Sequence, residues 1–178
     1  MTDKVFMNQQ IYQLIDKLLR NSDSKTTLLA LEKIFNTGIP FNIPHKFKFV
    51  ELSHQKTLLK LPFILKNKNH LGGLHACAVA TLGEYPAGLS LIKKFGASRY
   101  RLIMKRLQAE YFKQATTGVY GEVIIDHQEL DQLGQKLKTD DSAEIIMTTN
   151  ILNEDEEVIA VVQTTWQLKN WKKVSFKK

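Results

Sequence analysis

A glutamate stands in the middle of the most apolar segment of the chain. Glu84 lies in the run from Ala76 to Ile92, which contains no lysine and no arginine. A carboxylate buried without a partner in apolar surroundings is costly, so its presence there needs a reason. Two reasons stay open: the carboxylate is functional, or it reaches solvent or pairs with a lysine. His75 stands directly before this run, and it is either a catalytic group or an ordinary histidine at a helix start.

The residues before Glu84 form a spaced pattern with it. Asn69 is separated from His75 by five residues, and Glu84 follows His75 by nine. This pattern resembles the motif of hotdog-fold thioesterases of the phenylacetate-pathway type. The wider run resembles still more closely an uncharacterised hotdog family known only as thioesterase-like, on the residues Leu61-Pro62, Lys66-Asn67-Lys68-Asn69-His70 and His75-Ala76.

The resemblance implies a catalytic site between two subunits. Nine residues of helix separate His75 from Glu84 by about 13.5 Å along the axis, so the two side chains cannot meet within one chain. Glu84 of one chain would act as a general base on water or as a nucleophile. Asn69 and His75 of its neighbour would position the acyl group or the water. A homodimer or a dimer of dimers is therefore expected.

The start of the apolar helix offers backbone donors. The unpaired N–H groups and the dipole of a helix N-terminus can polarise a thioester carbonyl, and those between Gly73 and Ala76 are the candidates. The family's two glycines after the histidine are Ala76 and Cys77 in this sequence. Cys77 is expected to be an inert core residue rather than a nucleophile. His70 is either a substrate-binding residue or a plain loop residue.

A basic run follows the helix. Arg99 and Arg101 are its candidates for contact with the phosphates of a coenzyme A ester, and an ordinary solvated surface is the alternative. Tyr100 between them could instead stack on a nucleic-acid base, but no aromatic-rich recognition motif supports that reading. The other basic residues of the run are Lys93, Lys94, Lys105 and Arg106.

No metal site and no cofactor are predicted. His45, His54 and His127 belong to separate segments without the spacing of zinc ligands, and the single cysteine cannot form a cysteine-rich metal cluster. Gly72-Gly73 is only a fragment of a phosphate-binding loop.

Hydrophobic periodicity places these residues on a small number of elements. Two helices occupy the first 36 residues, with a break at residues 21–24, and Gly38 and Pro40 end the helical character. We therefore expect a helical extension over residues 1–38 and a main domain over residues 39–178. The main domain is expected to contain a hairpin (47–52 and 57–65), a long helix (75–94), four strands (100–113, 118–126, 142–152 and 158–171) and a short helix (128–138).

One long apolar helix among about six antiparallel strands can hide its surface only if the sheet curls around it. The sequence thus predicts an α+β fold of the hotdog type, with a curved antiparallel sheet around a central helix. Pro62 is expected to lie at a bulge or edge of the second strand, and Pro86 to kink the central helix.

Composition limits the class of protein. The chain has 178 residues, which is enough for one hydrophobic core. Its formal charge of +7 favours anionic partners, and its single cysteine indicates a reducing compartment. The apolar run is too short to span a membrane and holds a carboxylate. A cytoplasmic protein without a membrane span is expected, and nucleic-acid binding is a distant third reading.

The function predicted from these observations is hydrolysis of an acyl thioester, either an acyl-CoA or an acyl-carrier thioester, at a dimer interface. The alternative is a noncatalytic hotdog domain that binds an acyl chain or an acyl-CoA. The role of the N-terminal helices stays open: they pack over the sheet, or they cap an acyl-chain tunnel and set its length.

Overall fold

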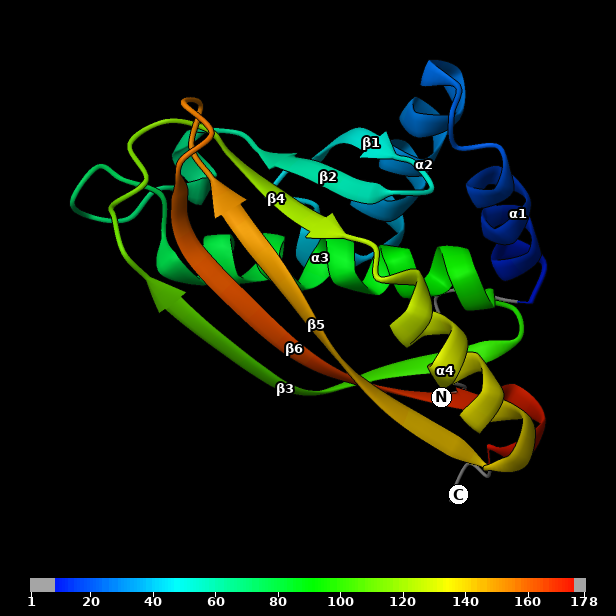
Figure 1. Cartoon of the computed structure of the whole chain (residues 1–178). Coiled ribbons are helices and arrows are strands. Elements are labelled where there is room, and N and C mark those ends of the chain that lie inside the picture. The colour runs from blue at the N-terminus through cyan, green and yellow to red at the C-terminus, as the bar shows by residue number, and fades with distance from the viewer. Residues whose placement is uncertain (1–8, 175–178) are drawn as a thin grey trace, which may run out of the picture.

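The computed structural model describes residues 9–174, and its centre is a single long helix. Helix α3 (Ala76–Phe95) runs across the middle of the molecule, and a strongly curved sheet wraps around it (Figure 1). His75 is the N-cap of α3, and the helix continues through Pro86 without interruption. No helix among the described residues is long and apolar enough to cross a membrane.

The sheet has six strands in the order β1-β2-β4-β5-β6-β3, and every pairing is antiparallel. β1 and β3 are therefore the two edge strands. The bounds of the strands are Lys48–Leu52 (β1), Lys56–Leu61 (β2), Tyr100–Tyr111 (β3), Val119–Ile124 (β4), Ser142–Leu152 (β5) and Val158–Asn170 (β6). The expected α+β hotdog fold is confirmed, because this sheet curls around one central helix.

A glycine allows α3 to lie close against the sheet. A Cβ atom on Gly83 would come within 2.4 Å of the Val162 side chain on β6, so no larger residue fits without a shift. The hydroxyl of Thr149 on β5 donates a hydrogen bond of 2.6 Å to the Gly83 carbonyl. Gly83 weakens the helix by its intrinsic propensity, but it is what permits this close helix–sheet contact.

The N-terminal helices share the core of the main domain. Helix α1 spans Gln9–Arg20, and helix α2 spans Lys25–Gly38 with Ser24 as its N-cap, whose hydroxyl accepts a hydrogen bond from the Thr27 N–H at 3.1 Å. The first residues of the expected first helix lie outside the described residues. Buried side chains of both helices pack in one cluster with α3 and β1, among them Ile15, Leu19, Leu31, Phe35, Phe47 and Leu82.

One sequence expectation about local structure is wrong. The second strand ends at Leu61, directly before Pro62, and it lies inside the sheet between β1 and β4; the irregularity is in β1, between Phe49 and Glu51. The expected short helix is present as α4 (His127–Thr139), one residue longer at each end than predicted. Asp126 is its N-cap and accepts a hydrogen bond from the Glu129 N–H at 2.9 Å.

Candidate functional site

The loop before α3 is held together by the side chain of Asn69. Its Oδ1 accepts hydrogen bonds from the N–H groups of Leu71 (2.9 Å) and Gly73 (3.2 Å), and its Nδ2 donates to the Leu74 carbonyl at 3.2 Å. The Asn69 N–H also donates to the Gly73 carbonyl at 2.8 Å. Within one chain, Asn69 thus fixes the shape of the loop that leads into the helix.

These contacts decide which backbone donors are free at the start of α3. The N–H of Gly73 donates to Asn69, that of Leu74 to the Ala115 carbonyl (2.8 Å), and that of His75 to the Asn67 carbonyl (2.7 Å). Among the described residues, the N–H of Ala76 has no such partner. Among the backbone N–H groups from Gly73 to Ala76, which the sequence analysis named as candidates, that of Ala76 is available to a ligand in the single chain.

His75 caps the helix with its ring. Its Nδ1 accepts a hydrogen bond from the Cys77 N–H at 3.1 Å, so the neutral ring carries its proton on Nε2. His75 is exposed. His70 is exposed in the preceding loop, and within residues 9–174 it forms no hydrogen bond with His75 or Asn69.

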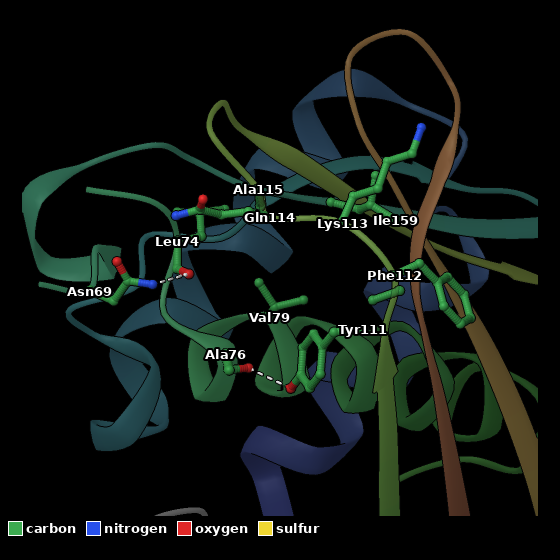
Figure 2. Close-up of a pocket in the computed structure, with 11 residues that line it drawn as sticks. Asn69, Leu74, Ala76, Val79, Tyr111, Phe112, Lys113, Gln114, Ala115 and Ile159 are labelled. Atoms are coloured by element: carbon green, nitrogen blue, oxygen red, sulfur yellow. Dashed lines mark hydrogen bonds between the residues drawn. The ribbon is translucent and has the colours of Figure 1, made fainter. Parts of the chain in front are cut away.

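A cavity of about 330 Å³, here called the loop cavity, opens beside this loop (Figure 2). Asn69, Ala76 and Val79 line one side, and the end of β3 and the segment after it line the other. Tyr111 at the end of β3 donates a hydrogen bond of 2.8 Å to the Ala76 carbonyl, and burial raises the pKa of its phenol. Sequence reasoning missed Tyr111, because a tyrosine at the end of a strand carries no signal of its own.

Glu84 lies two and a half turns further along α3, in a different depression. The Glu84 groove, of about 350 Å³, is lined by this carboxylate and by mostly apolar side chains, among them Phe35, Ile39, Leu102 and Trp166. Burial alone raises the pKa of the Glu84 carboxyl. No hydrogen bond or ion pair joins it to another of the described residues, so the lysine partner considered above is not found within one chain.

Within one chain the three motif residues do not converge. Asn69 lines the loop cavity and His75 caps the start of α3, whereas Glu84 lines its own groove further along the helix. Beside the Glu84 groove runs β3, whose outer edge pairs with no strand among the described residues. Ile103 and Met104 expose apolar side chains on this edge strand.

The basic run does not form a single charged patch. Lys94 pairs with Asp131 at 2.7 Å and Lys105 with Glu144 at 2.6 Å. The guanidinium of Arg99 lies 5.4 Å from the centre of the Tyr100 ring and is exposed. Arg101 differs from these residues, because its Nε is buried and has no hydrogen-bond partner among the described residues.

Two expectations about other side chains need correction. Cys77 is exposed rather than part of the core, because it lies on the outer side of the first helical turn while Ala78 and Val79 face inward. His54 and His127, which the sequence leaves in unrelated segments, meet with Nδ1 and Nε2 3.1 Å apart. Even so, residues 9–174 contain no group of three or more His, Cys, Asp or Glu side chains that could hold a metal ion.

Solved structures with the same fold are numerous. A protein of unknown function from Pseudomonas aeruginosa, described as a probable thioesterase, is 24% identical, with a TM-score of 0.71 over 78% of this chain and 93% of that one. A thioesterase from Haemophilus influenzae is 11% identical, with a TM-score of 0.65 over 80% and 90% of the two chains. A protein of unknown function from Chlorobaculum tepidum is 11% identical, with a TM-score of 0.71 over 84% and 98%.

At these identities the likeness establishes the fold. No curated protein matches this sequence. A family model does match, over residues 29–168, and its description is Domain of unknown function (DUF4442). The match covers most of the chain, including the Asn69 loop, the whole of α3 and all six strands except the last two residues of β6. The chain therefore belongs to the DUF4442 family and has the hotdog fold.

Proposed function

We propose that this protein hydrolyses acyl thioesters as a homodimer, with Glu84 of one protomer acting opposite the Asn69 loop and Ala76 of the other. The support comes from one observation above all: a carboxylate without a partner lies in an apolar groove, and burial raises its pKa. A raised pKa brings a carboxyl group closer to the range in which a general base is effective. Such shifts are more frequent at functional sites than elsewhere.

The chemistry follows from the groups present. Glu84 removes a proton from a water molecule, and the water oxygen forms a bond to the carbonyl carbon of the thioester. The Ala76 N–H of the other protomer donates to the oxyanion of the tetrahedral intermediate, aided by the positive end of the α3 dipole. The carbon–sulfur bond then breaks, and the thiolate leaves and takes up a proton. The products are a carboxylic acid and a free thiol.

A dimer through β3 would complete this site. The unpaired edge of β3 is a template for pairing with a second strand, and two copies of one edge can pair antiparallel around a twofold axis. Such a pairing continues the sheet from one protomer into the next. It also covers Ile103 and Met104, which are exposed on this edge strand in the single chain.

The leaving thiol is proposed to be coenzyme A or a carrier-bound thiol, with exposed Arg99 as a candidate contact for its phosphates. The noncatalytic alternative, binding of an acyl chain or acyl-CoA without hydrolysis, uses the same groove. A cytoplasmic location and the lack of a nucleic-acid partner stay predictions.

The test is release of free thiol from short, medium and long acyl-CoAs by the unmodified protein and by Glu84→Gln. The variant keeps the size of the side chain but cannot act as a base, so hydrolysis should fall by about 10²-fold or more. Glu129→Gln on exposed helix α4 is the matched control and should keep full activity.

Equal hydrolysis by the unmodified protein and Glu84→Gln removes Glu84 from the mechanism. Binding of acyl-CoA by both proteins without any thiol release, for coenzyme A and carrier-bound esters alike, overturns the hydrolase proposal in favour of the noncatalytic one.

A further inference from the structure

The Glu84 groove does not end at the carboxylate. A second depression, the distal cavity, has a volume of about 370 Å³ and shares four lining residues with the groove: Phe35, Ile39, Ile92 and Leu102. Because the same side chains line both, the two spaces adjoin along α3, and together they are here called the channel. From Glu84 to Ile92 this channel follows the helix for eight residues, or about 12 Å along its axis. That is the reach of a linear acyl chain of medium length.

Part of the wall of the distal cavity comes from the N-terminal helices. Tyr12 and Ile15 of α1 and Phe35 of α2 line it together with residues of β3, among them Leu102 and Ile103. The match to the family model begins only at residue 29, so α1 precedes the matched residues. Part of the far wall of the channel is therefore built by a helix outside that match.

A cation lies at the far end. The Nε of Arg101, which lines the distal cavity, is buried, and its N–H donates no hydrogen bond to any of the described residues. A buried donor on a charged group is costly when its hydrogen bond is not made. The other polar groups at this end do not meet it: the Trp171 indole N–H donates to the Ala97 carbonyl at 2.9 Å, and the carboxylate of Asp16 accepts from the N–H groups of Ala97 and Ser98.

We propose that the channel takes a linear acyl group whose far end carries a carboxylate, and that Arg101 binds this carboxylate. A carboxylate is the acceptor that a guanidinium binds most strongly, in a paired geometry that would use the free Nε–H. The apolar walls between Glu84 and Arg101 suit the methylene chain between the two polar ends. The inference rests on the proposed function for the position of the thioester beside Glu84, but recognition of the far carboxylate does not require hydrolysis.

The experiment compares two thioesters of equal chain length, decanoyl-CoA and its ω-carboxylated counterpart, the mono-CoA ester of decanedioic acid. Their dissociation constants are measured by calorimetry with the Glu84→Gln variant, which cannot hydrolyse the esters by the proposed mechanism. The ω-carboxylated ester should bind about tenfold tighter, as expected for one hydrogen bond to a charged group. Adding Arg101→Met should abolish this difference, whereas adding Arg20→Met, which removes an exposed arginine on α1 away from the channel, should preserve it.

A second variant tests the channel itself. Ile39 lines both the groove and the distal cavity, and Ile39→Trp should weaken binding of both ten-carbon esters by about tenfold while leaving butyryl-CoA unaffected, because one large side chain fills the connection. Equal affinity of the two ten-carbon esters for the parent protein overturns the proposal. So does a change in molar mass on Arg101→Met, since Arg101 would then belong to a subunit contact.

The outcomes separate this inference from the proposed function. In one outcome, the ω-carboxylated ester binds more tightly through Arg101 while the protein releases no thiol from any ester. That result supports the carboxylate site and refutes the proposed hydrolase function. Hydrolysis that depends on Glu84 but shows no preference between the two esters retains the hydrolase and refutes the inference.

Discussion

At the scale of single residues, the site depends on one backbone donor that can be removed without changing a side chain. Ala76 is the first residue of α3, a position where proline is well tolerated. The preceding residue, His75, has φ −72° and ψ 134°, which is the extended conformation that a residue before proline adopts. Ala76→Pro therefore deletes the N–H and preserves the fold.

We expect Ala76→Pro to lower kcat for thioester hydrolysis by about 10²- to 10³-fold, the usual cost of losing one oxyanion donor. The melting temperature should stay within a few degrees of the unmodified protein. Ala76→Ser, which keeps the N–H, is the control and should stay active. Full activity of the proline variant would show that the oxyanion is stabilised elsewhere.

Glu84 also gives a prediction for stability. Burial raises the pKa of this carboxyl in the folded state, so the folded protein favours the neutral form. Burial of Glu84 therefore costs the folded state least at pH values below the pKa that this carboxyl has in the unfolded chain. The free energy of unfolding falls as the pH rises from that value through the raised pKa of the folded state. Glu84→Gln removes the charge and should raise the melting temperature at pH 7.5.

This gain should shrink toward pH 4, where the carboxyl is mostly neutral in both states. Melting curves of the two proteins across this pH range measure it, with exposed Glu129→Gln as the reference substitution. A Glu84→Gln variant that is less stable at pH 7.5 would mean that the charge is compensated in the assembled protein.

At the scale of elements, the Asp16 side chain joins α1 to the turn that follows α3. Asp16 accepts hydrogen bonds from the Ala97 N–H (2.7 Å), the Ser98 N–H (3.1 Å) and the Ser98 hydroxyl (2.5 Å). These contacts hold the wall of the distal cavity in place, because Tyr12 and Ile15 lie on the same helix.

Asp16→Ala should lower the free energy of unfolding by about 1–3 kcal/mol, because it leaves backbone donors without partners. It should also speed amide hydrogen exchange in residues 9–20 more than in α3. Urea unfolding and exchange mass spectrometry measure the two effects, and Asp155→Ala in an exposed turn is the control. Unchanged exchange in α1 would mean that packing of Ile15 and Leu19 alone holds the helix.

At the scale of the whole molecule, the proposed site is split between two chains, and complementation tests this. Neither Glu84→Gln nor Ala76→Pro should be active alone. In a mixed dimer one of the two sites combines the intact Glu84 of one chain with the intact Ala76 of the other. Random mixing should therefore restore roughly a quarter of the unmodified activity.

The variants are unfolded and refolded together or produced in the same cells, and thiol release is then measured. The molar mass by light scattering should be at least about 41 kDa, twice the 20.4 kDa of one chain. Inactive mixtures that still contain mixed dimers would place Glu84 and Ala76 of the same chain in one site.

The sequence alone determined the elements, because their signals are local. The alternation of apolar residues in 142–152 and 158–171 predicts two strands, and the long apolar run predicts the central helix. The hotdog fold followed, since such a helix needs a curved sheet around it. Glu84 was visible for the same reason, as a charge that breaks a local apolar pattern.

Only the tertiary structure decided how the polar groups are used, because their partners are distant along the chain. It showed that, within residues 9–174, the Ala76 N–H has no partner while Leu74 donates to Ala115, and that His54 meets His127 across 73 residues. It also left the buried Nε of Arg101 without a hydrogen-bond partner from that part of the chain. Periodicity reports which side of an element is buried, whereas hydrogen-bond partners depend on how those elements are brought together in space.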